Sequence, residues 1–205
     1  MIGLPYSEAC ERNKEHILNV LLSVLPAQGR ILEIGSCTGQ HLVHFAAAFP
    51  GLAWQPTDRE EYLEGLAARI AAEGRDNILR AVELDVNSSW PDPHFDAVYS
   101  ANTAHIMSWE MVCDMFAGVG RLLRPGGVFC LYGPFNEAGR YTSDSNQVFD
   151  HSLRSRDPVM GIRDLEALDT LARSQHMELI QQERLPANNS LLVFQKTEEK
   201  ADGGC

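Results

Sequence analysis

The sequence has few cysteines, no long apolar run and no cluster of positive charge. No apolar run approaches the roughly 18 residues of a membrane span, and we expect neither a secretory leader nor a membrane contact. The formal net charge is −11, which argues against nucleic acid and favours a small, neutral or cationic partner. The five cysteines lack disulfide or metal spacing, which indicates a reducing, cytoplasmic setting; they are Cys10, Cys37, Cys113, Cys130 and Cys205.

The composition is that of one globular domain. At 205 residues the chain can bury one sizeable core, and 44% hydrophobic with 22% charged residues is ordinary for such a fold. We expect an N-terminal lid helix over residues 1–27, a main domain over 28–197 with an insert at 134–163, and a disordered tail at 198–205. We expect the protein to be either a monomer or a homodimer.

One stretch, Arg30–Gln40, organises the chain. Its first part, Ile31–Ile34, is almost continuously apolar, which is typical of a central parallel strand covered on both faces. Gly35 and Gly39 permit the backbone to approach a ligand closely, and the helix expected from Thr38 would point free N–H groups at that ligand. The stretch therefore predicts a site for a nucleotide-like cofactor.

The spacing of small residues in this loop separates two kinds of cofactor. A dinucleotide loop needs Gly-x-Gly-x-x-Gly, and of the three corresponding positions, Gly35, Cys37 and Gln40, only the first is Gly. Glu33 before Gly35 is instead similar to the start of the Glu-x-Gly-x-Gly-x-Gly loop of class I methyltransferases that use S-adenosylmethionine (SAM), with Cys37 replacing the middle Gly. An NAD-dependent oxidoreductase stays open as a more distant alternative. The cofactor loop is expected to comprise Glu33, Gly35, Ser36, Cys37 and Gly39.

Two acids end neighbouring strands of the expected sheet. Asp58 closes the predicted second strand, 52–58, where a carboxylate can accept hydrogen bonds from both ribose hydroxyls, or can cap the next helix. Asp85 closes the predicted third strand, 78–85, and can accept a bond from the adenine amine; it resembles the acid that class I methyltransferases place there, and Val86 follows it. NAD enzymes do not need this second acid, so Asp85 favours SAM.

Further candidates follow the predicted fourth strand, 95–100. Ala101, Asn102 and His105 lie beyond its carboxyl end, where ligands of open α/β sheets bind. His105 is the first candidate for a base, because an unperturbed histidine pKa suits proton removal near neutral pH, although a purely structural role stays open. Asn13, in the first turns of the N-terminal helix, either is solvated or folds over the cofactor.

A second motif lies later in the chain. Leu122–Gly127, followed by the apolar run Val128–Pro134, looks like the helix, Pro-Gly-Gly turn and fifth strand of class I methyltransferases. Residues 134–163 are too many for a simple β–α connection, and they predict a functional insert. The chain is expected to end with a helix and an antiparallel hairpin over residues 164–196.

Several short segments are closer to one subfamily than to methyltransferases at large. They resemble the methyltransferase-like protein 26 family, and they are Glu11–Lys14, Gly39–His41, Trp54–Pro56, Tyr132–Phe135, Ser145–Asn146, Gly161–Asp164 and Pro186–Asn189. The resemblance implies an α/β fold, a single Rossmann-like class I methyltransferase domain. Its seven-stranded, mostly parallel sheet would have the order 3-2-1-4-5-7-6, an antiparallel last strand and helices on both faces. It also implies SAM as methyl donor and S-adenosylhomocysteine (SAH) as product.

The methyl acceptor is left open by the resemblance. Because the SAM sulfonium is an activated donor, an enzyme needs chiefly to align a nucleophile and exclude water, so a base is optional. We expect a small molecule with an O, N or S nucleophile, bound by Tyr132, Phe135, Asn136, Asn146, Asn188 and Asn189. No metal is expected, because Cys37 with His41 and His44 on a helix surface is an incomplete ligand set. A SAM- or SAH-binding sensor without turnover is the main alternative.

Overall fold

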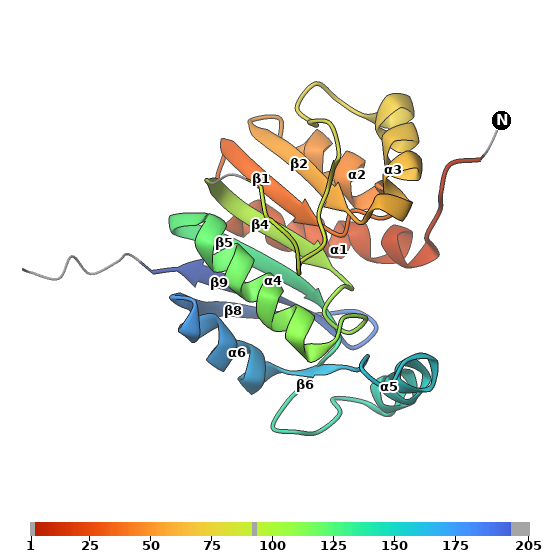
Figure 1. Ribbon diagram of the computed structural model, residues 1–205, viewed down its shortest axis with the longest axis vertical. Coiled ribbons are helices and arrows are strands. Elements are labelled where there is room, and N and C mark those ends of the chain that lie inside the picture. The colour runs from red at the N-terminus through yellow and green to blue at the C-terminus, as the bar shows by residue number, and fades with distance from the viewer. Residues whose placement is uncertain (1–2, 92–93, 198–205) are drawn as a thin grey trace, which may run out of the picture.

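A computed structural model describes residues 3–91 and 94–197 as helices packed on both sides of one seven-stranded sheet (Figure 1). The tail predicted at 198–205 lies outside these residues. The helices are α1 (Glu8–Val24), α2 (Gln40–Ala48), α3 (Glu60–Glu73), α4 (Trp109–Leu122), α5 (Asp144–Arg156) and α6 (Leu165–Ser174). The strands are β1 (Gly29–Ile34), β2 (Leu52–Asp58), β3 (Val82–Glu83), β4 (Phe95–Ala101), β5 (Leu123–Gly133), β6 (Phe135–Asn136), β7 (Arg163–Asp164), β8 (Met177–Leu185) and β9 (Asn189–Lys196).

The large sheet has the strand order β3-β2-β1-β4-β5-β9-β8. The first five strands in this order pair in parallel, whereas β9 runs antiparallel to both of its neighbours, β5 and β8. When only the strands of this sheet are counted, the order is 3-2-1-4-5-7-6. The predicted fold class is therefore confirmed. The short strands β6 and β7 form a separate parallel pair.

Successive residues of the central strands face two different cores. On β1, Ile31 packs into a cluster with α1 and α2, whereas Leu32 packs into a cluster with α4 and α6. Figure 1 shows α4 and α6 in front of the sheet and α1 and α2 behind it. Both side chains are fully buried, and each such burial stabilises the fold by about 1.5–3 kcal/mol. Burial on both faces explains why the sequence of this strand is apolar without alternation.

The starts of the helices follow local sequence signals. The N-cap side chains of α1, α4, α5 and α6 each accept a backbone N–H from the first helical turn, and these caps are Ser7, Ser108, Ser143 and Asp164. Each such cap is worth about 1 kcal/mol. Helix α2 differs, because Gly39 is its N-cap, has a φ of 73° and offers no side-chain cap.

Two predicted strands have different limits in the structure. The third strand was predicted over 78–85, but β3 contains only Val82 and Glu83, and Ile78 reaches β2 through a single bridge to Trp54. As the edge strand, β3 has a partner on one side only, which favours short pairing. Strand β5 begins at Leu123 and therefore includes the predicted Pro-Gly-Gly turn, opposite a register shift in β4.

The insert at 134–163 has a structure of its own. It contains β6 and α5, and Asp150 fixes the end of the insert by accepting the Ile162 backbone N–H at 2.6 Å. Arg163 then donates to the carbonyl oxygens of Ala104 and Val159, each at 3.0 Å. These bonds attach the insert to the segment that follows β4, so the insert is a docked element rather than a free loop.

Candidate functional site

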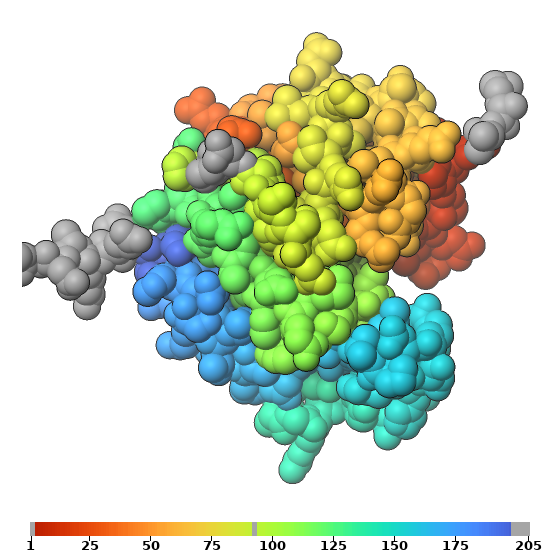
Figure 2. All heavy atoms as spheres, in the orientation of Figure 1, coloured from red at the N-terminus to blue at the C-terminus, as the bar shows by residue number. Residues whose placement is uncertain are grey.

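A cavity of about 760 Å³ lies at the carboxyl ends of the central strands. Its lining comes from α1, the β1–α2 loop, the ends of β2 and β4, α4, α5 and the β8–β9 hairpin. Figure 2 shows an indentation at the right edge of the molecule, between the red and orange N-terminal part and the cyan helix α5. Ligands of open α/β sheets bind at this edge, and the volume suits a small-molecule site.

The β1–α2 loop is held tightly against the end of β2. The backbone N–H groups of Gly35 and Ser36 both donate to the Thr57 carbonyl at 3.0 Å, and the Cys37 N–H donates to Asp58 Oδ2 at 2.6 Å. Cys37 has a φ of 47°, a left-handed conformation that favours Gly. The methyltransferase pattern with Gly at this position therefore has a conformational reason, and Cys37 occupies it under mild strain.

Glu33 lies at the floor of the cavity and is only 2% exposed. Its carboxylate accepts a hydrogen bond from Ser36 Oγ at 2.7 Å. Burial raises the pKa of Glu33 to about 7, and the nearby Asp58 carboxylate raises it further while the Ser36 bond opposes the rise. A cationic ligand in the cavity would therefore favour ionisation of Glu33.

Asp58 and Asp85 line the same end of the cavity as Glu33. Each carboxyl oxygen of Asp58 accepts one backbone N–H, from Cys37 and from Arg59 at 2.8 Å, which leaves further lone pairs for a ligand. Burial raises the pKa of Asp58, and these two bonds oppose the rise. The cap of α3 is Arg59, so Asp58 does not cap that helix.

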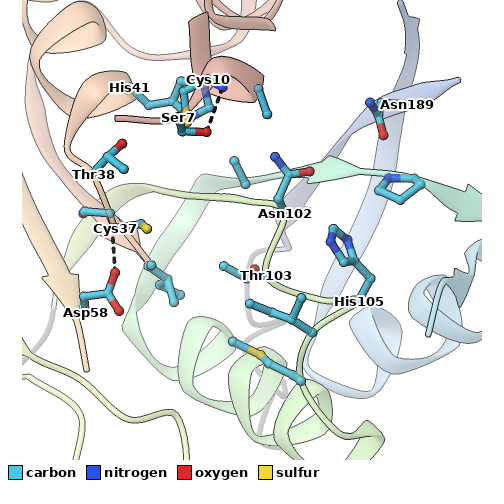
Figure 3. Close-up of a pocket in the computed structure, with 18 of the residues that line it drawn as sticks. Ser7, Cys10, Cys37, Thr38, His41, Asp58, Asn102, Thr103, His105 and Asn189 are labelled. Carbon is cyan, nitrogen blue, oxygen red and sulfur yellow. Dashed lines mark hydrogen bonds between the residues drawn. The ribbon is translucent and has the colours of Figure 1, made fainter. Parts of the chain in front are cut away.

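The opposite end of the cavity carries no such charge. Figure 3 shows Asn102 between Asp58 on one side and His105 and Asn189 on the other. His105 is 6% exposed, and its ring lies 5.2 Å from that of Phe149 on α5. Burial lowers the pKa of His105 to about 4, and the cations Arg163 and Arg156 lower it further. The expectation of an unperturbed pKa is therefore wrong, and His105 is uncharged at neutral pH.

Amide side chains join α5 to the β8–β9 hairpin beside this end. Asn146 Nδ2 donates to the Asn188 carbonyl at 3.0 Å, and Asn188 Nδ2 donates to Ser145 Oγ at 3.0 Å. Asn188 and Ala187 have φ values of 57° and 60°, so they form the left-handed turn, while Asn189 begins β9 and lines the cavity. The insert and the hairpin thus close one wall together.

A second, smaller cavity of about 340 Å³ lies between α1 and the hairpin, and we call it the side cavity. Asn13 and Tyr132 line it, and Asn102 and Asn189 line both cavities. Asn13 Oδ1 lies 2.7 Å from His41 Nε2, which fixes this turn of α1 against α2. His41 is buried, which corrects the expectation that it lies on the helix surface.

Most of the predicted site residues line the main cavity. These are Glu33, Gly35, Ser36, Cys37, Asp58, Asp85, Val86, Ala101, Asn102, His105, Asn146, Asn188 and Asn189. Three others lie outside the linings of both cavities. Gly39 packs against Arg69, whose Cγ would lie 2.8 Å from an added Cβ, so its part in the site is to shape the loop. Phe135 is a buried core residue and Asn136 pairs with β7, and their assignment to the substrate site stays a prediction.

Some lining residues were missed by the sequence reasoning. Cys10 lies one helical turn before Asn13, so the periodicity of α1 could have indicated it. Met107, just before α4, and Met111, in the first turn of α4, follow His105, and their spacing of four residues was a further signal. Nothing in the sequence marks Phe149, because only the docking of α5 brings it to the cavity.

Comparison with known proteins shows the family to which this chain belongs. Residues 4–196 match the family described as "Protein of unknown function (DUF938)". Sterol 24-C-methyltransferase ERG6B from Gibberella zeae is 32% identical over 137 residues, covering 62% of this chain and 34% of that protein. The chain thus spans about a third of this curated relative.

Solved methyltransferase structures share the fold. An O-methyltransferase family protein from Burkholderia thailandensis has a TM-score of 0.80 at 14% identity, covering 94% of this chain and 59% of its own. Human N-acetylserotonin methyltransferase in complex with SAM has a TM-score of 0.78 at 18% identity, and the match covers 93% of this chain and 53% of the human chain. The YcgJ protein from Bacillus subtilis has a TM-score of 0.71 at 19% identity, and the match covers 90% of this chain and 100% of YcgJ. These likenesses establish the Rossmann-like methyltransferase fold.

Proposed function

We propose that this chain, which belongs to the DUF938 family, transfers the methyl group of SAM to a small-molecule acceptor. The observation that carries the proposal is a cavity with three carboxylates at one end and uncharged polar groups at the other, at the ligand edge of a methyltransferase fold. An adenosine and a sulfonium fit the acidic end, because carboxylates accept hydrogen bonds from hydroxyl and amine groups and attract cations.

Each residue at the acidic end has a distinct part in this proposal. Asp58 would accept bonds from the ribose hydroxyls while it orders the loop through the Cys37 N–H. Asp85, whose Oδ1 already accepts the Asn87 N–H at 3.1 Å, would accept the adenine amine. Glu33 would lie under the cationic part of the cofactor, where ionisation offsets its burial. The loop Gly35–Gly39 would bring the backbone close to the ligand.

The uncharged end would hold the acceptor. SAM supplies an activated methyl group, so the residues have to align the acceptor and exclude water. Asn102 and Asn189 offer donors and acceptors, and Phe149 and Met107 provide an apolar wall. His105, uncharged at neutral pH, can accept a hydrogen bond or the proton of the nucleophile, which makes it a positioning group or a weak base.

Narrower assignments are part of the same proposal. The short segments at 11–14, 54–56 and 186–189 support a place in the methyltransferase-like protein 26 family. A monomer or homodimer, a metal-free reaction and a cytoplasmic location stay predictions. Among the described residues, no helix is long and apolar enough to span a membrane, and Cys10, Cys37, Cys113 and Cys130 are free thiols.

Calorimetry followed by a methyl-release assay tests the proposal. SAM and SAH should bind the wild-type protein, and a panel of metabolites with O, N and S nucleophiles should contain an acceptor that releases SAH. Binding without product for every metabolite would favour the sensor alternative. Tighter binding of NADH than of SAH would reject the SAM site.

A further inference from the structure

The side cavity differs in charge from the rest of this acidic protein. Of the described residues that line it, none carries a carboxylate, although the chain has a net charge of −11. Its polar groups are one guanidinium, one imidazole, three amides and one phenol, which belong to Arg12, His16, Asn13, Asn102, Asn189 and Tyr132. All except the amide oxygens can donate hydrogen bonds. Such a lining suits a ligand that accepts hydrogen bonds and carries negative charge.

Tyr132 brings a phenol hydroxyl to the side cavity, which Asn13 and Asn189 also line. Burial raises the pKa of Tyr132, and the side chains of Asn13 and Asn189 oppose that rise, as hydrogen-bond donors to a phenol oxygen do. Asn13 Oδ1 lies 2.7 Å from His41 Nε2, which leaves the amide nitrogen of Asn13 for other partners. A phenol hydroxyl can both accept and donate a hydrogen bond, so Tyr132 can donate to a ligand in the side cavity.

Arg12 is available for a ligand in the same cavity. Its only ion pair in the described chain joins Nη1 to Glu8 at 3.2 Å, and the two side chains are 71% and 78% exposed. Exposed pairs with this spacing on a helix contribute little to stability, so an anionic ligand can compete with Glu8 for Arg12. A guanidinium can bind a carboxylate through two parallel hydrogen bonds.

The size and position of the cavity indicate which molecule it holds. A volume of about 340 Å³ reaches the range of a whole small-ligand site, far more than one carboxylate group of the cofactor would fill. Arg12, Asn102 and Asn189 line both cavities, so a ligand here adjoins the main cavity. Asn102 takes a φ of 59°, a strained conformation of the kind that gathers at functional sites.

We propose that the side cavity holds the methyl acceptor, with a carboxylate of the acceptor bound by Arg12 and the Tyr132 hydroxyl, so that the acceptor is a small carboxylic acid. This inference rests on the proposed function for the identity of the main cavity. A phosphate is disfavoured, because a dianion facing the single guanidinium of the side cavity would be undercompensated. The nucleophile itself is left unassigned.

Calorimetric titration with simple carboxylates tests the inference. Acetate, benzoate and hexanoate, each matched with its neutral amide, are titrated into the protein alone and into its SAH complex. We expect at least one carboxylate to bind about fivefold or more tightly than its amide. Tyr132→Phe and Arg12→Gln should each weaken that carboxylate by about threefold or more and leave the amide unchanged.

Two control variants match these changes. Arg173→Gln removes an exposed arginine that pairs with Asp169 at 3.0 Å with the same helical spacing, and Arg173 lies outside both cavity linings. Tyr141→Phe removes a tyrosine hydroxyl that donates to Asp150 at 2.9 Å on the insert. Both controls should bind the carboxylate as the wild type does.

Three results would overturn the inference. One is equal binding of every carboxylate and its amide, and another is equal loss in the test and control variants. The third is a weaker affinity of Tyr132→Phe for SAH with unchanged affinity for decarboxylated SAH, which would assign the cavity to the cofactor's own carboxylate. Absence of any SAH binding would instead reject the proposed function, and the titrations of the free protein would still decide whether a carboxylate site exists.

Discussion

The two ends of the main cavity are built in different ways. The acidic end is assembled from consecutive β–α units, and the bond from Cys37 to Asp58 spans only 21 residues of sequence. The opposite end joins two distant segments, the insert and the hairpin, and the bond from Asn146 to Asn188 spans 42 residues. The first end uses carboxylates and the second uses amides. The residues proposed to bind SAM can therefore be predicted from local sequence. The residues proposed to select the methyl acceptor depend on tertiary contacts.

The largest expected effect tests the uncharged end. His105→Ala should lower turnover on the acceptor found by the metabolite screen by about 100-fold or more while leaving SAH affinity within about twofold. In the wild type the pKa of His105 is about 4, so titration of His105 should not change kcat at saturating SAM between pH 5.5 and 7. Steady-state kinetics and calorimetry check both points. A loss of SAH affinity with an unchanged melting temperature would assign His105 to the cofactor end.

The second prediction concerns Glu33 and pH. A folded pKa of about 7, above the usual value of 4.5, means that the folded state binds more protons than the unfolded state between these values. Stability from this group is thus present below pH 4.5 and is lost as the pH rises through 7. Glu33→Gln should therefore raise the free energy of unfolding at pH 8 by up to about 3 kcal/mol and change it little at pH 4.

Urea unfolding at the two pH values measures this difference. The matched control is Glu178→Gln, which alters an exposed glutamate on β8. Equal effects of the two variants at pH 8 would show that the ionised Glu33 is not destabilised by its burial.

The third prediction compares the two acids of the cofactor end. Asp58→Ala should weaken SAH binding by about 2 kcal/mol, because it removes the ribose acceptor and releases the Cys37 N–H. Asp85→Ala should cost about 1 kcal/mol, for a single bond. Calorimetry compares both with Asp96→Ala, which removes a carboxylate that accepts the Arg30 N–H outside both cavity linings. Unchanged affinity in both site variants would reject the proposed cofactor orientation.

The smallest expected effect concerns the strain at Cys37. Since its φ is 47°, Cys37→Gly should retain SAH binding and raise the free energy of unfolding by up to about 1 kcal/mol. In the wild type, SAH should slow the alkylation of Cys37, measured by peptide mass spectrometry at alkaline pH because burial raises the thiol pKa. Cys113 on α4 lies outside both cavity linings and serves as the internal reference. Equal protection of both thiols, or of neither, would contradict the placement of the loop.

The net charge shows where sequence reasoning was too coarse. A total of −11 favoured a neutral or cationic partner, but the carboxylates that line the main cavity include Glu33, Asp58 and Asp85 at one end, and the side cavity has none among its described lining residues. A binding site responds to the charges within about one Debye length, roughly 8–10 Å, and not to the total. The total charge therefore says little about the acceptor.

The sequence by itself indicated the central strands and the place of the loop between β1 and α2, whereas the order of the seven strands came from the family resemblance. Apolar strands followed by Gly and acid residues are local signals, because one strand, one turn and one helix start suffice to define them. It also indicated the β8–β9 hairpin, since a turn between two strands is local as well.

Only the tertiary structure decided the chemistry of the uncharged end. Burial and two arginines lower the pKa of His105, and no local pattern shows which residues will surround a side chain. The docking of α5 brings Phe149 into the cavity, while Phe135, at the start of the same insert, enters the core. The side cavity exists because α1 and the hairpin pack near the end of β5, and long-range packing of this kind depends on the whole fold rather than on any segment.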